Sequence, residues 1–187
     1  MLTNWADNFI SPSYTTLTNN LVLLEASGNT FAGSRNLQNL ENLRASFINA
    51  YMSWQYVEMF DIGLAEETYY KSKMNIYPTT VSRIELNIQN GNTDFNNSNN
   101  YAAQGFPALD YLLYGIENSD ELILSKYNNE SQYLSYLSMI INQMLQNTSP
   151  IVEDWQSYRN TFISSVENTA TSSVNKMTND FIYYYEK

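Results

Sequence analysis

Cysteine and histidine are both absent from this sequence of 187 residues. Their absence excludes disulfides, a catalytic thiol, a Ser-His-Asp triad and zinc sites built on nitrogen or sulfur ligands. It also excludes general acid catalysis by imidazole. A metal ion would have to bind oxygen ligands, which favours hard ions such as Ca²⁺, Mg²⁺ or Fe³⁺ over Zn²⁺.

Basic residues are scarce, with 9 Lys and Arg against 19 Asp and Glu, and the formal net charge is −10. This balance argues against nucleic acid as a partner, because phosphates require clustered Lys and Arg. It argues equally against an anionic membrane surface. An acidic surface serves solubility first, and it also permits the binding of a cation.

Long apolar runs are also missing, and none approaches the length of about 18 residues that predicts a transmembrane helix. The start Met1–Trp5 has neither the basic nor the apolar region of a signal peptide. A leader that has been removed and a cytoplasmic origin both fit this start. With 43% hydrophobic residues, the chain can bury a core, and we expect a single domain over residues 1–187.

Apolar residues recur at helical spacings, and no segment alternates with the period that marks a strand. We therefore expect an all-α fold, an up-down helical bundle. The first helix covers residues 2–26 with a kink or break at Pro12, and Gly28 and Gly33 mark a turn region. A second helix carries one apolar stripe and ends near Gly63. Its stripe consists of Leu40, Leu43, Phe47, Ala50, Trp54 and Val57.

Further helices are expected toward the C-terminus. One covers residues 78–89 with Pro78 at its first position, and a loop rich in Asn and Ser follows at 90–100. A longer helix covers residues 129–146. Another begins at residues 149–150, because serine followed by proline is typical of a helix start.

The segment from Gln104 to Gly115 combines a helix start with a carboxylate. Pro107 is expected to open a helix of about two to three turns, with Asp110 one turn later among apolar residues that look buried. We interpret Asp110 either as a helix-start residue with satisfied hydrogen bonds or as a ligand at a functional site. Glu58, at the edge of the second helix's stripe, is either a solvated flank or part of a cation site between helices.

The other acidic and aromatic residues favour surface and packing roles. The adjacent pairs Glu66-Glu67 and Asp120-Glu121 point apart on a helix, and we interpret them as solvated surface. The 16 tyrosines are expected at the edge of the core or at an interface, with a tyrosine-lined ligand pocket as the alternative.

Several segments match a known pattern in the same order along the chain. Gln104–Gly115 is similar to a Gly-x-His-x-x-Glu segment with an apolar helix after it, and Gly105, Pro107 and Asp110 stand at the Gly, His and Glu positions. The other matching segments are 50–60, 76–78, 84–85, 133–134 and Trp155. In these segments the chain resembles the bacterial imelysin-like family, over residues 36 to 187.

The resemblance implies an all-helical fold of two related, bundle-like halves with the functional site between them. This chain resembles the first half, and the aromatic run at 181–187 would then lead into a missing C-terminal half that covers it. The resemblance carries over Glu58, Gly105, Pro107 and Asp110 as ligand-binding positions, with Asp110 and Glu58 as metal ligands. It also implies a periplasmic or outer-membrane-anchored protein, often a lipoprotein, with a role in iron uptake.

Members of the family are classed with metallopeptidases, and the replaced His bears on that activity. A His-x-x-Glu peptidase needs the His to hold the metal that activates water, and proline has no donor atom. Asp110 also reaches about 1.5 Å less far than a Glu. We therefore expect a non-catalytic binding component of the cell envelope, with iron or another divalent or trivalent cation on oxygen ligands and with envelope iron-uptake partners. The alternatives are a metallopeptidase whose ligands come from the missing half, and a helical protein-interaction module.

Overall fold

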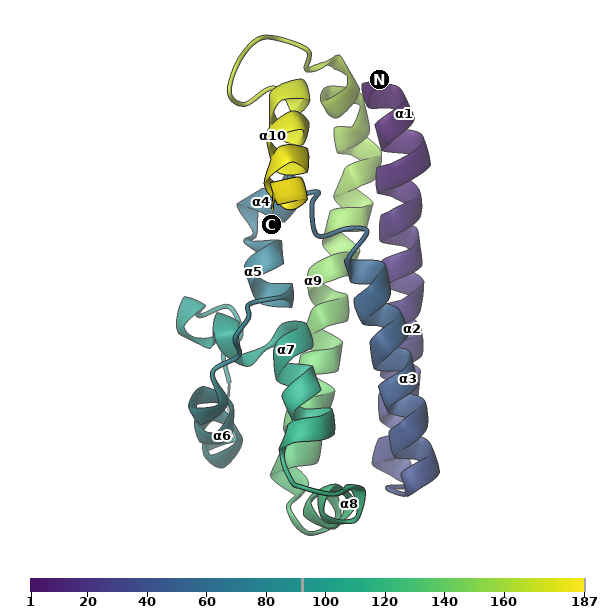
Figure 1. Ribbon diagram of the computed structural model, residues 1–187, viewed down its shortest axis with the longest axis vertical. Helices are drawn as coiled ribbons and strands as arrows, with labels where there is room; N and C mark the ends of the chain where they lie inside the picture. The colour runs from purple at the N-terminus through teal and green to yellow at the C-terminus, as the bar shows by residue number, and fades with distance from the viewer. Residues whose placement is uncertain (92, 187) are drawn as a thin grey trace.

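The computed structural model describes residues 1–91 and 93–186, and the regular elements of that part of the chain are all helices. Three long helices form the frame, namely α2 (Ser11–Gly33), α3 (Leu37–Trp54) and α9 (Ser131–Ser164). Both α3 and α9 pack along α2, so the three run lengthwise together (Figure 1). The prediction of an all-α bundle is confirmed.

Shorter elements lie beside this frame and at its lower end (Figure 1). They are α4 (Leu64–Glu67), α5 (Tyr70–Met74), α6 (Val81–Asn90), the 3-10 helix η2 (Ser98–Ala103), α7 (Gly105–Asp110), the π-helix η3 (Tyr111–Gly115), α8 (Asp120–Asn129) and α10 (Ser173–Glu186). The chain begins with α1 (Leu2–Trp5) and the π-helix η1 (Ala6–Ile10), which continue directly into α2. Across the described residues, no helix is both long and apolar enough to cross a bilayer.

The first helix is longer than predicted and does not break at Pro12. Pro12 is the second residue of α2, with one residue between it and the end of the π-helix η1, and the wider π turn leaves room for a residue that has no N–H to donate. The turn predicted at Gly28 is wrong, because Gly28 is buried inside α2. A Cβ there would lie 2.9 Å from Cδ1 of Ile141 on α9, so this glycine permits the close approach of the two helices.

Helix α3 ends at Trp54, earlier than the predicted end near Gly63. Val57 belongs to the predicted stripe and is buried, yet it lies in the turns that follow the helix. Its N–H donates to the carbonyl of Trp54 at 2.8 Å. The apolar spacing therefore predicted burial correctly and overestimated the length of the helix.

Helix α6 begins at Val81, and Pro78 lies outside it in an exposed bend after a cis peptide bond. The residues before α6 hydrogen-bond to η2 instead of starting a helix, because the Thr80 N–H and the Thr79 hydroxyl both donate to the carbonyl of Ala102 at 2.7 Å. The loop predicted at 90–100 contains only the start of η2, while Asn92 within it lies outside the described residues.

The two helices predicted at 129–146 and from 149 onward are a single helix, α9, with Pro150 inside it. Its apolar stripe continues on both sides of the proline through Met144, Ile151 and Trp155. A proline in a helix interior costs about 3 kcal/mol, and burial of large side chains at about 1.5–3 kcal/mol each outweighs that cost.

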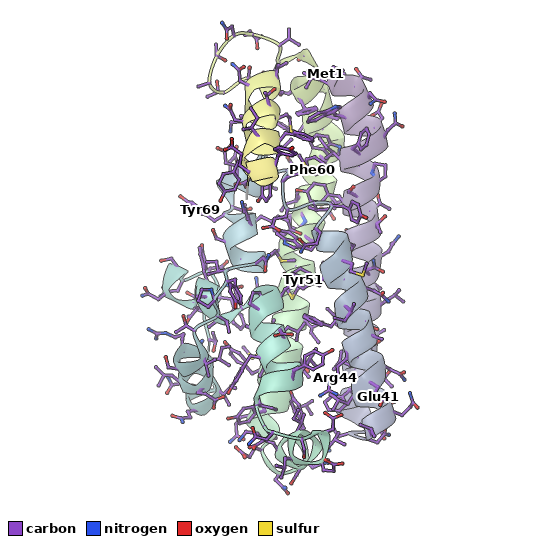
Figure 2. The ribbon with its side chains drawn as sticks, in the orientation of Figure 1. Met1, Glu41, Arg44, Tyr51, Phe60 and Tyr69 are labelled. Atoms are coloured by element: carbon purple, nitrogen blue, oxygen red, sulfur yellow. The ribbon has the colours of Figure 1, made fainter. Side chains whose placement is uncertain are left out.

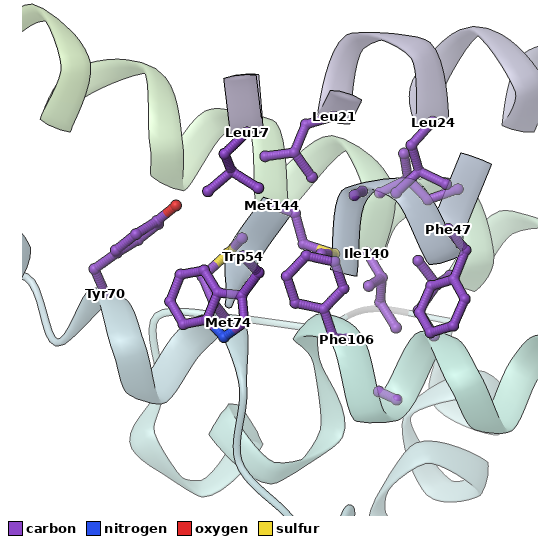
Figure 3. Close-up of a cluster of buried hydrophobic side chains, with 14 of the residues drawn as sticks. Leu17, Leu21, Leu24, Phe47, Trp54, Tyr70, Met74, Phe106, Ile140 and Met144 are labelled. Atoms are coloured by element: carbon purple, nitrogen blue, oxygen red, sulfur yellow. The ribbon is translucent and has the colours of Figure 1, made fainter. Parts of the chain in front are cut away.

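The core lies where α2, α3, α7 and α9 meet (Figure 3). Trp54 is its centre, with its ring 5.4 Å from that of Tyr70 and 6.0 Å from that of Phe106. The other labelled members are Leu17, Leu21, Leu24, Phe47, Met74, Ile140 and Met144. Phe106 belongs to the segment Gln104–Gly115, so this core fixes that segment against the frame.

Candidate functional site

Gly105 begins α7 in the left-handed region, with φ of +73°. A Cβ at this position would lie 2.2 Å from the carbonyl oxygen of Met74, so the start of α7 packs directly on the backbone at the end of α5. The side chain of the preceding residue, Gln104, is buried and donates from Nε2 to the carbonyl of Phe95 at 2.8 Å. The conformation and the contact together require glycine here.

Pro107 is the third residue of α7 and does not open it, contrary to the prediction. It is still in the first turn, where a missing N–H leaves no helical hydrogen bond unmade. Helix α7 runs into the π-helix Tyr111–Gly115, and together they have the predicted length. Ala108 and Leu109 are fully buried, while Pro107 is half-buried.

Asp110 is exposed, so the expectation of a buried carboxylate is wrong. Partial burial by its neighbours still raises its pKa. Within the described residues, Asp110 makes no hydrogen bond and no ion pair. Its carboxylate is therefore available to a ligand.

Asp110 and Pro107 line a cavity of about 500 Å³ between α3 and the α7–η3 segment. Figure 2 shows Tyr51 on the side of α3 that faces this segment. The walls are mainly aromatic and apolar. The lining residues are Phe47, Ile48, Tyr51, Tyr77, Thr79, Phe106, Pro107, Asp110, Tyr111, Tyr114 and Gly115.

Arg44 of α3 supports the pocket from behind Tyr114. Its guanidinium lies 4.5 Å from the centre of the Tyr114 ring. It donates to the carbonyl of Leu113 at 2.8 and 3.1 Å and to the carboxylate of Asp120 at 2.7 and 3.0 Å. Burial raises the pKa of Tyr114, and the charges of Asp110 and Asp120 add to that rise while Arg44 opposes it.

Glu85 of α6 binds two tyrosine hydroxyls, and one of these tyrosines lines the pocket. The hydroxyl of Tyr111, a pocket residue, donates to Glu85 Oε1 at 2.7 Å, and the hydroxyl of Tyr133 on α9 donates to Oε2. Burial and the hydrogen bonds to Glu85 raise the pKa of both tyrosines. Both hydroxyls therefore stay protonated. The carboxylate of Glu85 connects Tyr111 to Tyr133 of α9, and this fixes the orientation of the Tyr111 ring.

Glu58 lies elsewhere. It is buried beside α10, and its backbone carbonyl accepts a hydrogen bond from the Tyr184 hydroxyl at 3.0 Å. Glu58 is not among the residues that line the pocket of Asp110. Among the residues that the structure describes, no group of three or more acidic side chains is arranged to hold a metal ion. The assignment of Asp110 and Glu58 as metal ligands stays a prediction.

With the fold and the pocket defined, comparison with known proteins identifies the family. The family model for imelysin, a peptidase family, matches residues 10–187. The chain belongs to the imelysin family. No curated protein matches this imelysin-family chain.

Two solved structures share its fold. A protein described as an iron-regulated protein A precursor, from Parabacteroides distasonis ATCC 8503, has a TM-score of 0.73 and 15% identity, over 96% of this chain and 53% of that one. An imelysin-like protein from Psychrobacter arcticum 273-4 has a TM-score of 0.75 and 18% identity, over 99% of this chain and 58% of that one. The chain thus spans a little over half the length of each.

Sequence reasoning found the segment of the imelysin-family signature but not the other walls of its pocket. Tyr51, Tyr111 and Tyr114 were treated only as members of a tyrosine-rich set. A signal was present, since Tyr114 follows Asp110 by four residues and Tyr111 by three, and residues at these two spacings are neighbours on the surface of a helix. The contribution of α3 required the tertiary structure.

Proposed function

We propose that this imelysin-family chain is a non-catalytic binding component of the bacterial cell envelope, linked to the uptake of iron or another metal. The observation that carries the proposal is the wall of the pocket. Pro107 stands there at the position of the motif His, beside an unpaired Asp110 and aromatic rings. The link to iron and to the envelope rests on the description of one structural relative as iron-regulated and on the family resemblance.

We expect no peptide hydrolysis because of the few metal-binding atoms that the pocket offers. A metallopeptidase holds its metal on several protein ligands and uses it to lower the pKa of a bound water. In this pocket the lining offers one carboxylate together with hydroxyl groups, and the whole chain has no His. Ca²⁺ takes about six to eight oxygen ligands, so a metal ion at Asp110 would need further oxygen ligands from outside this lining.

Calorimetric titration of the chain with Fe³⁺, Ca²⁺ and Zn²⁺ tests the metal link. We expect an affinity for the hard ions that the double variant Asp110→Ala, Glu58→Ala lowers, with Glu153→Gln on the exposed face of α9 as the control. Unchanged affinity in the double variant would remove both residues from the site. A parallel assay with an unfolded protein substrate should show no cleavage, and cleavage that a chelator stops would instead support the metallopeptidase alternative.

The alternative of a helical interaction module is favoured by a separate surface. Trp5, Phe9, Met59, Phe60 and Phe181 surround a wholly apolar hollow of about 160 Å³ at the outer end of the bundle. Exposed apolar surface of this kind is typical of an interface. A second helical half of the same fold is the partner we propose for it.

Sedimentation velocity over a range of concentrations tests this surface. If it is an interface, the wild-type chain should self-associate weakly through it, and Phe181→Ser should abolish the association. Leu122→Ser, on the exposed face of α8, is the control. A monomer at every concentration would argue against the interaction module.

A further inference from the structure

We propose that the pocket between α3 and the α7–η3 segment binds a small organic cation, a quaternary or alkyl ammonium group on an apolar scaffold. The inference rests on the proposed binding function and names the class of ligand for that site. It depends on three features of the pocket: its aromatic walls, its single unpaired carboxylate and its lack of basic side chains.

The size and the walls fit such a ligand. A volume of about 500 Å³ lies within the range of small-molecule sites, about 300–1,000 Å³. Rings come from both walls, with Tyr51 on α3 and with Phe106, Tyr111 and Tyr114 in the α7–η3 segment. The face of an aromatic ring carries negative charge density, and recognition of quaternary ammonium groups by several such rings is an established use of it.

The charge of the pocket selects a cation. Among the described residues that line the cavity, Asp110 is the one carboxylate, and none is Lys or Arg. Arg44, whose guanidinium lies 4.5 Å from the centre of the Tyr114 ring, is bound to the carboxylate of Asp120 and to the carbonyl of Leu113, so its charge is already compensated. The net charge of −10 adds a general attraction for cations.

Tyr114 already shows the interaction on one of its faces, where the Arg44 guanidinium lies 4.5 Å from the ring centre. Asp110 precedes Tyr114 by four residues and is near enough to influence its pKa. A cation in the pocket would thus contact a ring and a carboxylate together. An anion would be repelled by Asp110, and a neutral apolar ligand would gain nothing from it.

Isothermal titration with choline tests the proposal, using 3,3-dimethyl-1-butanol as a neutral ligand of the same shape. We expect choline to bind at least about fivefold more tightly, since a charge at contact distance from Asp110 contributes about 1 kcal/mol even at the dielectric constant of water. Equal affinity for the two compounds, or no binding of choline up to about 10 mM, a concentration far above a typical small-ligand affinity, would overturn it.

Variants separate the role of the charge from that of the ring. Asp110→Asn should weaken choline about fivefold and leave the neutral alcohol unchanged. Tyr114→Leu should weaken choline by a similar factor, whereas Tyr114→Phe keeps the ring and should keep the affinity. Glu153→Gln removes one carboxylate from an exposed position on α9 and serves as the control for net charge. Circular dichroism confirms that each variant is folded.

The two proposals fail in different ways. If Fe³⁺ or Ca²⁺ binds with dependence on Asp110 and choline does not bind, the organic-cation inference is overturned and the metal-binding function stands. If choline binds with the expected dependence and no metal ion binds, the inference stands and the link to metal uptake is lost. Equal effects of Asp110→Asn and Glu153→Gln on choline would show a general charge effect and overturn the inference.

Discussion

At the scale of single residues, Gly105 has the strictest requirement in the candidate site. Its backbone conformation strains any residue with a side chain, and its distance to the Met74 carbonyl leaves no room for a Cβ. Gly91 offers a comparison, because its φ is +66° and, apart from its chain neighbours, no heavy atom of the described residues lies within 4 Å of the position that a Cβ would take. Substitutions at these two glycines therefore separate the energetic cost of backbone strain from that of a steric clash.

Gly105→Ala should destabilise the fold by about 3 kcal/mol or more, because the α5–α7 contact must open in addition to the backbone strain. Gly91→Ala should lose only about 1–2 kcal/mol, the cost of a left-handed residue. Urea unfolding followed by circular dichroism measures both. Equal losses in the two variants would show that the contact with Met74 does not matter.

The sequence predicted some of these residues well and others poorly. Gly105 was recognised by its place in a motif, but its clash with Met74 depends on a contact between segments about thirty positions apart. Asp110 was expected to be buried because its neighbours are apolar. Helical geometry places those neighbours toward α9 and Asp110 on the other side, and the sequence alone does not show which side faces the core.

At the scale of elements, α10 is attached to the rest of the molecule mainly by polar and aromatic contacts. Lys176 pairs with Glu66 of α4. The Lys71 ammonium of α5 lies 4.5 Å from the centre of the Tyr184 ring. Of the apolar side chains in α10, Met177 is buried and Phe181 is exposed. The attachment of α10 therefore depends more on charged groups than the packing of the frame helices α2, α3 and α9 does.

The attachment of α10 should weaken as the pH rises. Burial, and then the charge of Asp61, raise the pKa of Asp180 in α10 from 3.8 to about 6, with a smaller rise from Glu66 and opposition from Lys71 and Lys176. Between these two pH values the folded state binds a proton at Asp180 that the unfolded state has lost, so the contribution of Asp180 to stability falls as the pH rises from about 4 to 6 and then levels off.

Asp180→Asn should remove that contribution and stabilise the protein at pH 7 by about 1 kcal/mol, a figure reduced because the carboxylate is only partly buried. Thermal melts at several pH values measure it, and amide exchange shows whether the change is confined to α10. Glu186→Gln, an exposed carboxylate on the same helix, is the control. A stability difference between Asp180→Asn and the wild type that stays constant between pH 4 and 6 would contradict the prediction.

The sequence predicted helices correctly, but it did not always predict where each helix begins and ends. The apolar spacing located α2, α3 and α9 because those helices bury one continuous face. Local signals failed where packing outweighed them. Pro150 suggested a helix start and Gly28 a turn, yet both lie inside helices whose faces pack over their whole length.

At the scale of the whole molecule, Arg44 joins three parts of the chain. From α3 it binds the carbonyl of Leu113 in η3 and the carboxylate of Asp120 at the start of α8. Arg159 of α9 makes an equally bidentate pair with Asp7, at 2.6 and 2.7 Å, but in a more exposed place. The two arginines show what burial adds to the same interaction.

Arg44→Met should cost about 2–3 kcal/mol of unfolding free energy, because a buried carbonyl and a carboxylate lose charged hydrogen bonds. Arg159→Met should cost less than about 1 kcal/mol, as exposed ion pairs do. Chemical denaturation of both variants in parallel gives the comparison. A loss at Arg159 as large as that at Arg44 would contradict the argument from burial.

The family and the fold class followed from the sequence, since the segments that carry the resemblance include buried residues at helical spacings, such as Trp54, Ile84 and Leu109. The pocket did not follow, because its two walls come from helices separated by about sixty residues. The predicted pairing of Glu58 with Asp110 illustrates the difficulty. Each was a reasonable ligand on its own helix, yet Glu58 lies beside α10 and is not part of the pocket lining.

The cation over Tyr114 has a consequence for how such a pocket changes over evolutionary time. Arg44 lies over one face of the Tyr114 ring, and Tyr114 lines the cavity. A substitution at Arg44 would let the ring tilt and would alter the shape of the cavity, although Arg44 is not among its lining residues. Related chains can therefore diverge in ligand preference while every residue that touches the ligand stays the same.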